Sequence, residues 1–351
     1  MKIPFAGYTK LINKILFLLG RKKRKLPKFI LYFIVLSLLE LIGLGLIAPY
    51  LSILVNPETF VESGIYTFLT HVGFSGEVND LIKTLGLMLI LAFLLKSICM
   101  LLVNRAIFRF SLDQEVNLRS RLMWSYQNLP YAEFLKRNSS EYTHSIQILT
   151  SNFASVLNNL LRISSEFLVG MCIFAILAWT DIFALSILLI VLAVSMSIYS
   201  IAFNKKVINF GKLSNLALTD IVKSVNEGIK GIKEIRVLRK EKFFHKNLVL
   251  NANKYAEATL KYSIISTIPR YFLEFIMIVF VVSLVLFSIN TGDDIESLLP
   301  IIGVFGVASV RLIPSASQIL NGFITIQNAK YGLDLLVSDI QHSEPLVNST
   351  K

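Results

Sequence analysis

The sequence FILYFIVLSLLELIGLGLIAPYLSILV, residues 29–55, contains a single charged residue, Glu40. An α-helix rises about 1.5 Å per residue, so a helix of this length exceeds the roughly 30 Å hydrocarbon core of a bilayer. The segment therefore predicts a membrane-spanning helix. It also sets the class of protein against which the rest of the chain is interpreted.

Further apolar segments follow the first one. The run from Phe167 to Asn204 is too long for one span and predicts a hairpin that turns at residues 179–181. Only 17% of the residues are charged, whereas a soluble globular protein carries roughly 25%. We expect an all-α polytopic membrane protein rather than a large soluble helical core. The expected spans cover about 29–55, 81–108, 161–180, 182–204, 271–289 and 298–318.

Lys and Arg alternate from loop to loop. They are dense in residues 1–28 and in the connections after spans two and four, whereas residues 56–80 and 290–297 contain none. Because cytoplasmic loops are enriched in basic residues, both termini are expected in the cytoplasm. We expect the bacterial cytoplasmic (inner) membrane. The net charge of +12 then needs no nucleic-acid partner.

The amino-terminal residues 1–28 alternate apolar and basic side chains before the first span. Leu11, Ile15 and Leu18 recur at helical spacing, with Lys10 and Lys14 between them. This pattern predicts an amphipathic elbow helix on the inner leaflet, followed by a basic leader. The alternative is an irregular basic leader throughout.

The two long inner connections, residues 109–160 and 205–269, are rich in helix formers and break only near the middle. The breaks fall at residues 128–130 in the first and at Gly228 and Gly231 in the second. The membrane helices are therefore expected to extend far into the cytoplasm, where a short transverse helix joins each pair. Apolar residues at these tips predict contacts with a partner, although the two tips could instead pack on each other.

Four phrases, in the right order and topology, carry a resemblance to a known family. They are LPYAEFLKRNSSEY (residues 129–142), EGIKGIKEIRVLRKEKFF (227–244), PRYFLEF (269–275) and VRLIPS (310–315). Together they resemble the transmembrane domain of an ABC exporter, and are most similar to PglK-type flippases of lipid-linked oligosaccharides. The resemblance covers residues 29–336 as the six-helix domain, and leaves 337–351 as a linker or truncated tail.

The resemblance implies a dimer with a second copy or a homologous half-transporter, and coupling helices that contact an ABC ATPase. The implied coupling residues are Pro130, Tyr131, Phe134, Gly231, Ile232, Glu234 and Ile235. The sequence contains neither a GxxxxGK[ST] phosphate loop nor an LSGGQ-like phrase. No cofactor and no catalytic residue are expected in this chain, and ATP and Mg would bind a nucleotide-binding domain that it lacks. That ATPase is expected on a separate subunit or in a longer gene product.

Charged residues inside spans are costly and usually face a cavity or a partner. By position, the resemblance implies that Lys96, Arg270 and Arg311 receive an anionic head group, with Glu274 and Glu40 also in the substrate cavity. Lys96 in span two would lack the bidentate phosphate geometry of Arg. The alternative is that Arg270 and Glu274 form an intrahelical pair, while Lys96 and Arg311 reach towards an interface.

Between spans one and two, the resemblance implies an external helix that engages a polyprenyl tail, with Ile65, Tyr66, Phe68 and Leu69. A plain interfacial helix would have the same pattern. The four histidines lie far apart outside any metal-binding motif, so no metal site is expected. We expect a lipid-linked saccharide as substrate. The alternatives are a lipid, peptide or drug exporter, or a scaffold that does not transport.

Overall fold

The computed structural model describes residues 5–55, 78–180, 182–291 and 295–349. Within these ranges every long element is helical. In chain order the elements are α1 (Phe5–Leu19), the 3₁₀ helix η1 (Gly20–Lys25), α2 (Leu26–Val55), α5 (Val78–Gln127), α6 (Tyr131–Phe134), α7 (Ser139–His144), the π-helical turn η2 (Ser145–Leu149), α8 (Thr150–Thr180), α9 (Ile182–Lys230), α10 (Ile232–Val237), α11 (Glu241–Thr291) and α12 (Ile295–Ser349).

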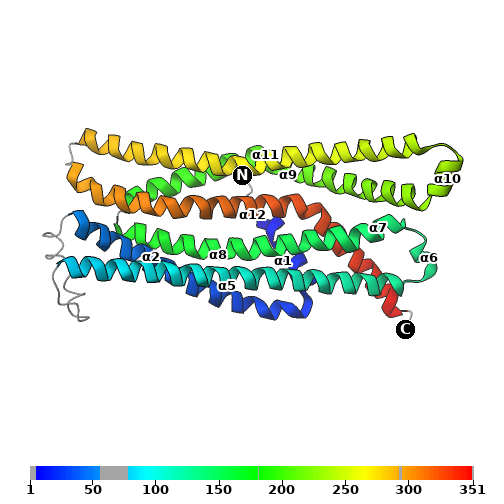
Figure 1. Cartoon of the computed structure of the whole chain (residues 1–351), viewed down its shortest axis with the longest axis horizontal. Coiled ribbons are helices and arrows are strands. Elements are labelled where there is room, and N and C mark those ends of the chain that lie inside the picture. The colour runs from blue at the N-terminus through cyan, green and yellow to red at the C-terminus, as the bar shows by residue number, and fades with distance from the viewer. Residues whose placement is uncertain (1–4, 56–77, 181, 292–294, 350–351) are drawn as a thin grey trace.

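The long helices run side by side along the longest axis of the molecule (Figure 1). In this view α9 and α11 lie along one edge and α2 and α5 along the other, with α8 and α12 between them. The short helices α6 and α10 are both at the same end. This arrangement confirms the expected all-α polytopic membrane architecture.

Four segments in the described ranges are long and apolar enough to cross a membrane: Lys10–Ile47, Asp80–Gln127, Ser139–Ala178 and Glu241–Val279. The helices outrun a bilayer, since the 50 residues of α5 span about 75 Å. On the part of α5 that precedes Asn104, many large apolar side chains are exposed, which a lipid surrounding accommodates.

The two helical connections break where the chain offers a turn residue. Pro130 precedes α6 with extended backbone angles, and Gly231 precedes α10. Gly228, which we also expected to interrupt the second connection, lies inside α9. Its backbone stays helical because a single glycine only weakens a helix and does not end it.

The amino-terminal helix α1 packs on the bundle and contacts α12. The apolar side of α1 is buried in the main core through Leu11, Ile15 and Leu18, and Lys14 Nζ lies 2.6 Å from Asp334 Oδ1 of α12. One side of the elbow helix therefore packs on the bundle, while its other side is exposed. Residues 337–349, expected to be a linker or tail, continue α12 as helix.

The two largest apolar clusters of the described residues join most of the long helices. The larger includes Phe33, Leu122, Leu157 and Leu336, each at most 1% exposed, from α2, α5, α8 and α12. The smaller joins α8, α9, α11 and α12 through residues that include Val169, Leu188, Met277 and Leu312.

We predict that Gly211→Ala destabilises the bundle by about 1–3 kcal/mol. A Cβ at Gly211 of α9 would lie 2.1 Å from the backbone oxygen of Asn328 in α12, so the two helices would have to separate. Gly228→Ala, in the same helix with nothing within 4 Å of the added carbon, is the matched control. Thermal unfolding followed by circular dichroism tests this; equal midpoints for the two variants would contradict the close packing of α9 on α12.

Candidate functional site: a charged cluster beside an apolar cavity

Glu40 of α2 is the centre of a buried ionic cluster. Its side chain is 1% exposed, and one oxygen, Oε1, accepts hydrogen bonds from Lys96 Nζ at 2.7 Å and Arg311 Nε at 2.9 Å. Lys96 comes from α5 and Arg311 from α12, so one carboxylate joins three helices. The Lys96 ammonium also lies 4.8 Å from the ring centroid of Phe93, which adds a cation–π contact.

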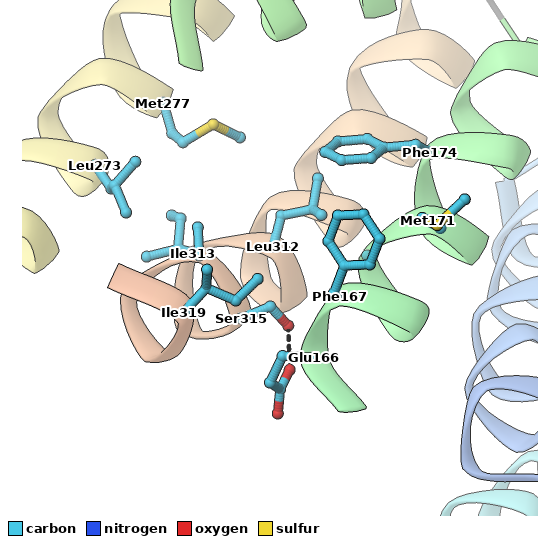
Figure 2. Close-up of a pocket in the computed structure, with 12 residues that line it drawn as sticks. Glu166, Phe167, Met171, Phe174, Leu273, Met277, Leu312, Ile313, Ser315 and Ile319 are labelled. Carbon is cyan, nitrogen blue, oxygen red and sulfur yellow. Dashed lines mark hydrogen bonds between the residues drawn. The ribbon is translucent and has the colours of Figure 1, made fainter. Parts of the chain in front are cut away.

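A second carboxylate extends the cluster to α8. Arg311 Nη2 lies 3.3 Å from Glu166 Oε2, and Ser315 Oγ donates a hydrogen bond of 2.6 Å to the same oxygen. Figure 2 shows this bond between the two helices. The cluster thus holds two cations and two anions, which leaves it without formal net charge. Such balance is what an apolar surrounding requires of buried charges.

An apolar cavity of about 270 Å³ opens beside Glu166. Leu273 and Met277 of α11 approach it from one side, opposite Phe167, Met171 and Phe174 of α8 (Figure 2). Leu312, Ile313, Ser315, Ala316 and Ile319 of α12, with Gly170 of α8, complete the lining. The cavity therefore offers apolar surface with one polar corner, the arrangement expected for an amphiphile.

The structure brings together three of the five charged residues singled out from the sequence, Glu40, Lys96 and Arg311. The other two pair with each other: Arg270 Nε lies 3.1 Å from Glu274 Oε1, one turn along α11. Their side chains are 68% and 42% exposed, outside the buried cluster. The intrahelical pair that we considered as an alternative is thus present.

Glu166 is the site residue that the sequence analysis missed. It directly precedes the uncharged apolar run that begins at Phe167. At such a position an acidic residue is typical of the polar end of a helix. The available signal was its position inside the expected span 161–180, because a charged residue within a span usually faces a cavity or a partner. The expected external-helix residues Ile65, Tyr66, Phe68 and Leu69 lie outside the described residues.

At the far end of the bundle, the two short helices present apolar side chains. Tyr131 is 74% exposed at the start of α6 and Ile232 is 48% exposed at the start of α10. Ile235, expected at the same surface, is instead buried, because α10 packs this side against its own hairpin. Phe134 likewise faces inwards and stacks on Tyr142, with 4.9 Å between ring centroids.

The first tip is tied to the end of α12. Arg137 Nη1 lies 2.5 Å from Asp339 Oδ1, and the Tyr126 hydroxyl donates a hydrogen bond to Asp339 Oδ2. Burial and the Asp339 carboxylate raise the pKa of Tyr126, so its hydroxyl keeps its proton. Burial lowers the pKa of nearby His144, which favours its neutral form. The α6 connection and α12 are therefore joined by charge as well as by apolar packing.

Residues 34–294 match the model of the family described as the ABC transporter transmembrane region. The match runs from α2 to the end of α11. It includes Glu40, Lys96 and Glu166 of the cluster, while Arg311 lies beyond it in α12. The match agrees with the resemblance to the transmembrane domain of an ABC exporter, and it covers three of the four sequence phrases.

We predict that Glu40→Gln destabilises the chain by about 3 kcal/mol, because it leaves Lys96 and Arg311 without their shared carboxylate in an apolar surrounding. Glu274→Gln removes a carboxylate from an exposed pair and should cost no more than about 1 kcal/mol. Unfolding of the purified variants in mixed micelles, followed by circular dichroism, measures both. If the two substitutions cost the same, the cluster is not the stabilising element proposed here.

Proposed function

The chain belongs to the family of ABC transporter transmembrane regions, and from this premise we propose that it is the membrane-spanning half of an ATP-driven exporter or flippase. The observation that carries this proposal is the apolar cavity beside a charged cluster between α8, α11 and α12. An amphiphile has the same two parts, an apolar tail and a polar head. The chain would move it outwards from the inner leaflet.

Energy for this movement would come from an ABC ATPase, on a separate subunit or in a longer polypeptide, which binds ATP and Mg. The exposed Tyr131 and Ile232 support an ATPase contact at the two tips. Pro130, Gly231 and Glu234 shape or flank this surface, whereas Phe134 and Ile235 support it from within. A dimer with a second copy or a homologous half would complete the transporter.

Both termini are proposed to be cytoplasmic, in a bacterial inner membrane. Two observations support this orientation. The connections at the end that carries α6 and α10 are rich in Lys and Arg, and the carboxyl terminus lies at that same end (Figure 1).

For the substrate we propose a lipid-linked saccharide whose diphosphate binds Lys96 and Arg311. Both cations are already paired with carboxylates in the described structure, so the head group would have to replace Glu40 at their side. Arg270 and Glu274 lie about one helical turn from the cavity residues Leu273 and Met277. At the entrance of the cavity they would contact the head group. The replacement of Glu40 by the head group can be tested by substituting either the carboxylate or one of the two cations.

We predict that Lys96→Gln weakens binding of a prenyl diphosphate to the purified full chain about tenfold or more, because it removes a charge-assisted contact. Glu40→Gln should leave binding equal or tighter, since it frees Lys96 and removes one of the two carboxylates beside Arg311. Lys83→Gln, which breaks only the exposed pair with Asp80, is the matched control and should change nothing. Titration in detergent measures the dissociation constants, with the prenyl alcohol of equal chain length as the neutral probe.

Equal affinity for the diphosphate and the alcohol, unchanged by Lys96→Gln, would contradict the anionic substrate. That result would favour the second candidate, an exporter of an uncharged lipid, peptide or drug. One observation already speaks for this candidate: apart from Glu166 and Ser315, the cavity is lined by apolar residues and Gly170.

We predict that Tyr131→Asp and Ile232→Asp each abolish co-purification of an ABC ATPase with the tagged chain from its native membrane, because a charge replaces an exposed apolar contact. The control is Val249→Asp. Val249 is an exposed apolar residue of α11 away from the tips, and its substitution should retain the ATPase. Intact-mass measurement of the captured chain distinguishes a separate ATPase subunit from one fused to the chain. Capture of the unaltered chain without any ATPase would favour the scaffold.

A further inference from the structure

An open groove of about 590 Å³ lies on the outer face of α5, away from the cavity described above. It is lined by Leu101, Asn104, Arg105, Phe108, Arg109, Leu112 and Asp113. Arg105 and Arg109 are exposed and stand one helical turn apart on the same side. Two like charges at this spacing repel each other, so their arrangement calls for a neutralising partner.

No such partner is present within the described ranges. Neither guanidinium forms a hydrogen bond or ion pair there, and Asp113, one turn beyond Arg109, is not within ion-pair distance of it. Arg162 of α8 adds a third cation nearby. Its Nη2 donates to Asn104 Oδ1 at 3.4 Å, and its guanidinium carbon lies 5.3 Å from the Phe108 ring centroid.

The depth of this groove coincides with the inner membrane surface. Phe29 at the start of α2 contacts Phe110, with 5.2 Å between ring centroids, which brings Arg109 level with the beginning of the first span. The exposed basic run Arg21–Lys25 directly precedes that span. A basic run at a helix end marks the level of the lipid head groups.

An apolar strip continues from the groove towards the middle of the membrane. Leu94, Leu95, Ile98, Leu101 and Leu102 are between 47% and 71% exposed. From Arg105 to Leu94 the helix rises about 16 Å, close to the roughly 15 Å depth of one leaflet. The face therefore combines cations at head-group depth with apolar surface at acyl-chain depth.

We propose that this face of α5 is a binding site for an anionic phospholipid of the inner leaflet. Its phosphate binds Arg105 and Arg109, and its acyl chains lie along Leu101, Leu102 and Ile98. A second copy of the chain is a less suitable occupant. The carboxylates of the described membrane segments, Glu40, Glu166 and Glu274, are already paired within their own chain.

Native mass spectrometry of the purified full chain, titrated with phosphatidylglycerol and phosphatidylcholine, tests the proposal. We predict that the unaltered chain prefers phosphatidylglycerol, and that the double variant Arg105→Gln/Arg109→Gln weakens this binding about twenty-five-fold, since each basic residue contributes roughly fivefold. Phosphatidylcholine binding should not change. The control Lys246→Gln/Lys254→Gln removes two exposed charges from the cytoplasmic part of α11 and should leave both affinities unaltered.

Equal binding of the two lipids by the unaltered chain would overturn the proposal, and this measurement does not depend on the folding of any variant. Competition by inorganic phosphate at the concentration of the lipid would assign the site to a free anion instead. Cross-linking of two chains through Leu101→Cys, with Cys99 and Cys172 replaced by Ser, would place a second copy on this face. The result is independent of the transported substrate.

Discussion

Glu40 holds two cations inside the apolar part of the bundle, and the positions of four helices follow from that arrangement. Lys96 and Arg311 share one of its oxygens, and Arg311 passes the connection on to Glu166. Apolar packing alone lets membrane helices slide or rotate, because a contact between two leucines can be exchanged for a similar contact with a neighbouring leucine at small cost in free energy. A buried charge allows only the geometry in which its partner is within reach. The cluster therefore fixes α2, α5, α8 and α12 relative to one another, and the cavity between α8, α11 and α12 takes its shape from them.

Much of this fold could be predicted from the sequence because its signals are local. Apolar runs predict helices, and Pro130 and Gly231 mark the breaks near the tips. The Arg270 and Glu274 pair also follows from spacing, because residues four apart on a helix face each other. The partners of Glu40 are different: Lys96 is 56 positions away and Arg311 is 271. Each could be recognised as a costly charge in a span, but their meeting depends on how three helices rotate about their axes, which no local pattern encodes.

The tips show the same limit on a smaller scale. The sequence predicts both Ile232 and Ile235 as contacts for the ATPase, yet Ile232 is exposed and Ile235 is buried. The short helix α10 has only 6 residues, too few for periodicity to reveal which side faces its own hairpin. Glu166 was missed because it directly precedes the uncharged apolar run that begins at Phe167, although it lies inside the expected span 161–180. In each case the missing information is the orientation of a helix rather than its existence.

The length of the helices has a mechanical consequence. The 51 residues of α11 extend about 76 Å, with few interruptions along the way. A rod of this kind acts as a lever: pivoting by about 5° about its midpoint moves each end by roughly 3 Å. The ion pair between Arg137 and Asp339 ties the first tip to α12, so a displacement at the end that carries α6 and α10 is shared between neighbouring helices. Stiffness, rather than any moving hinge, would then carry a small shift at the tips into the half of the bundle that surrounds the cavity.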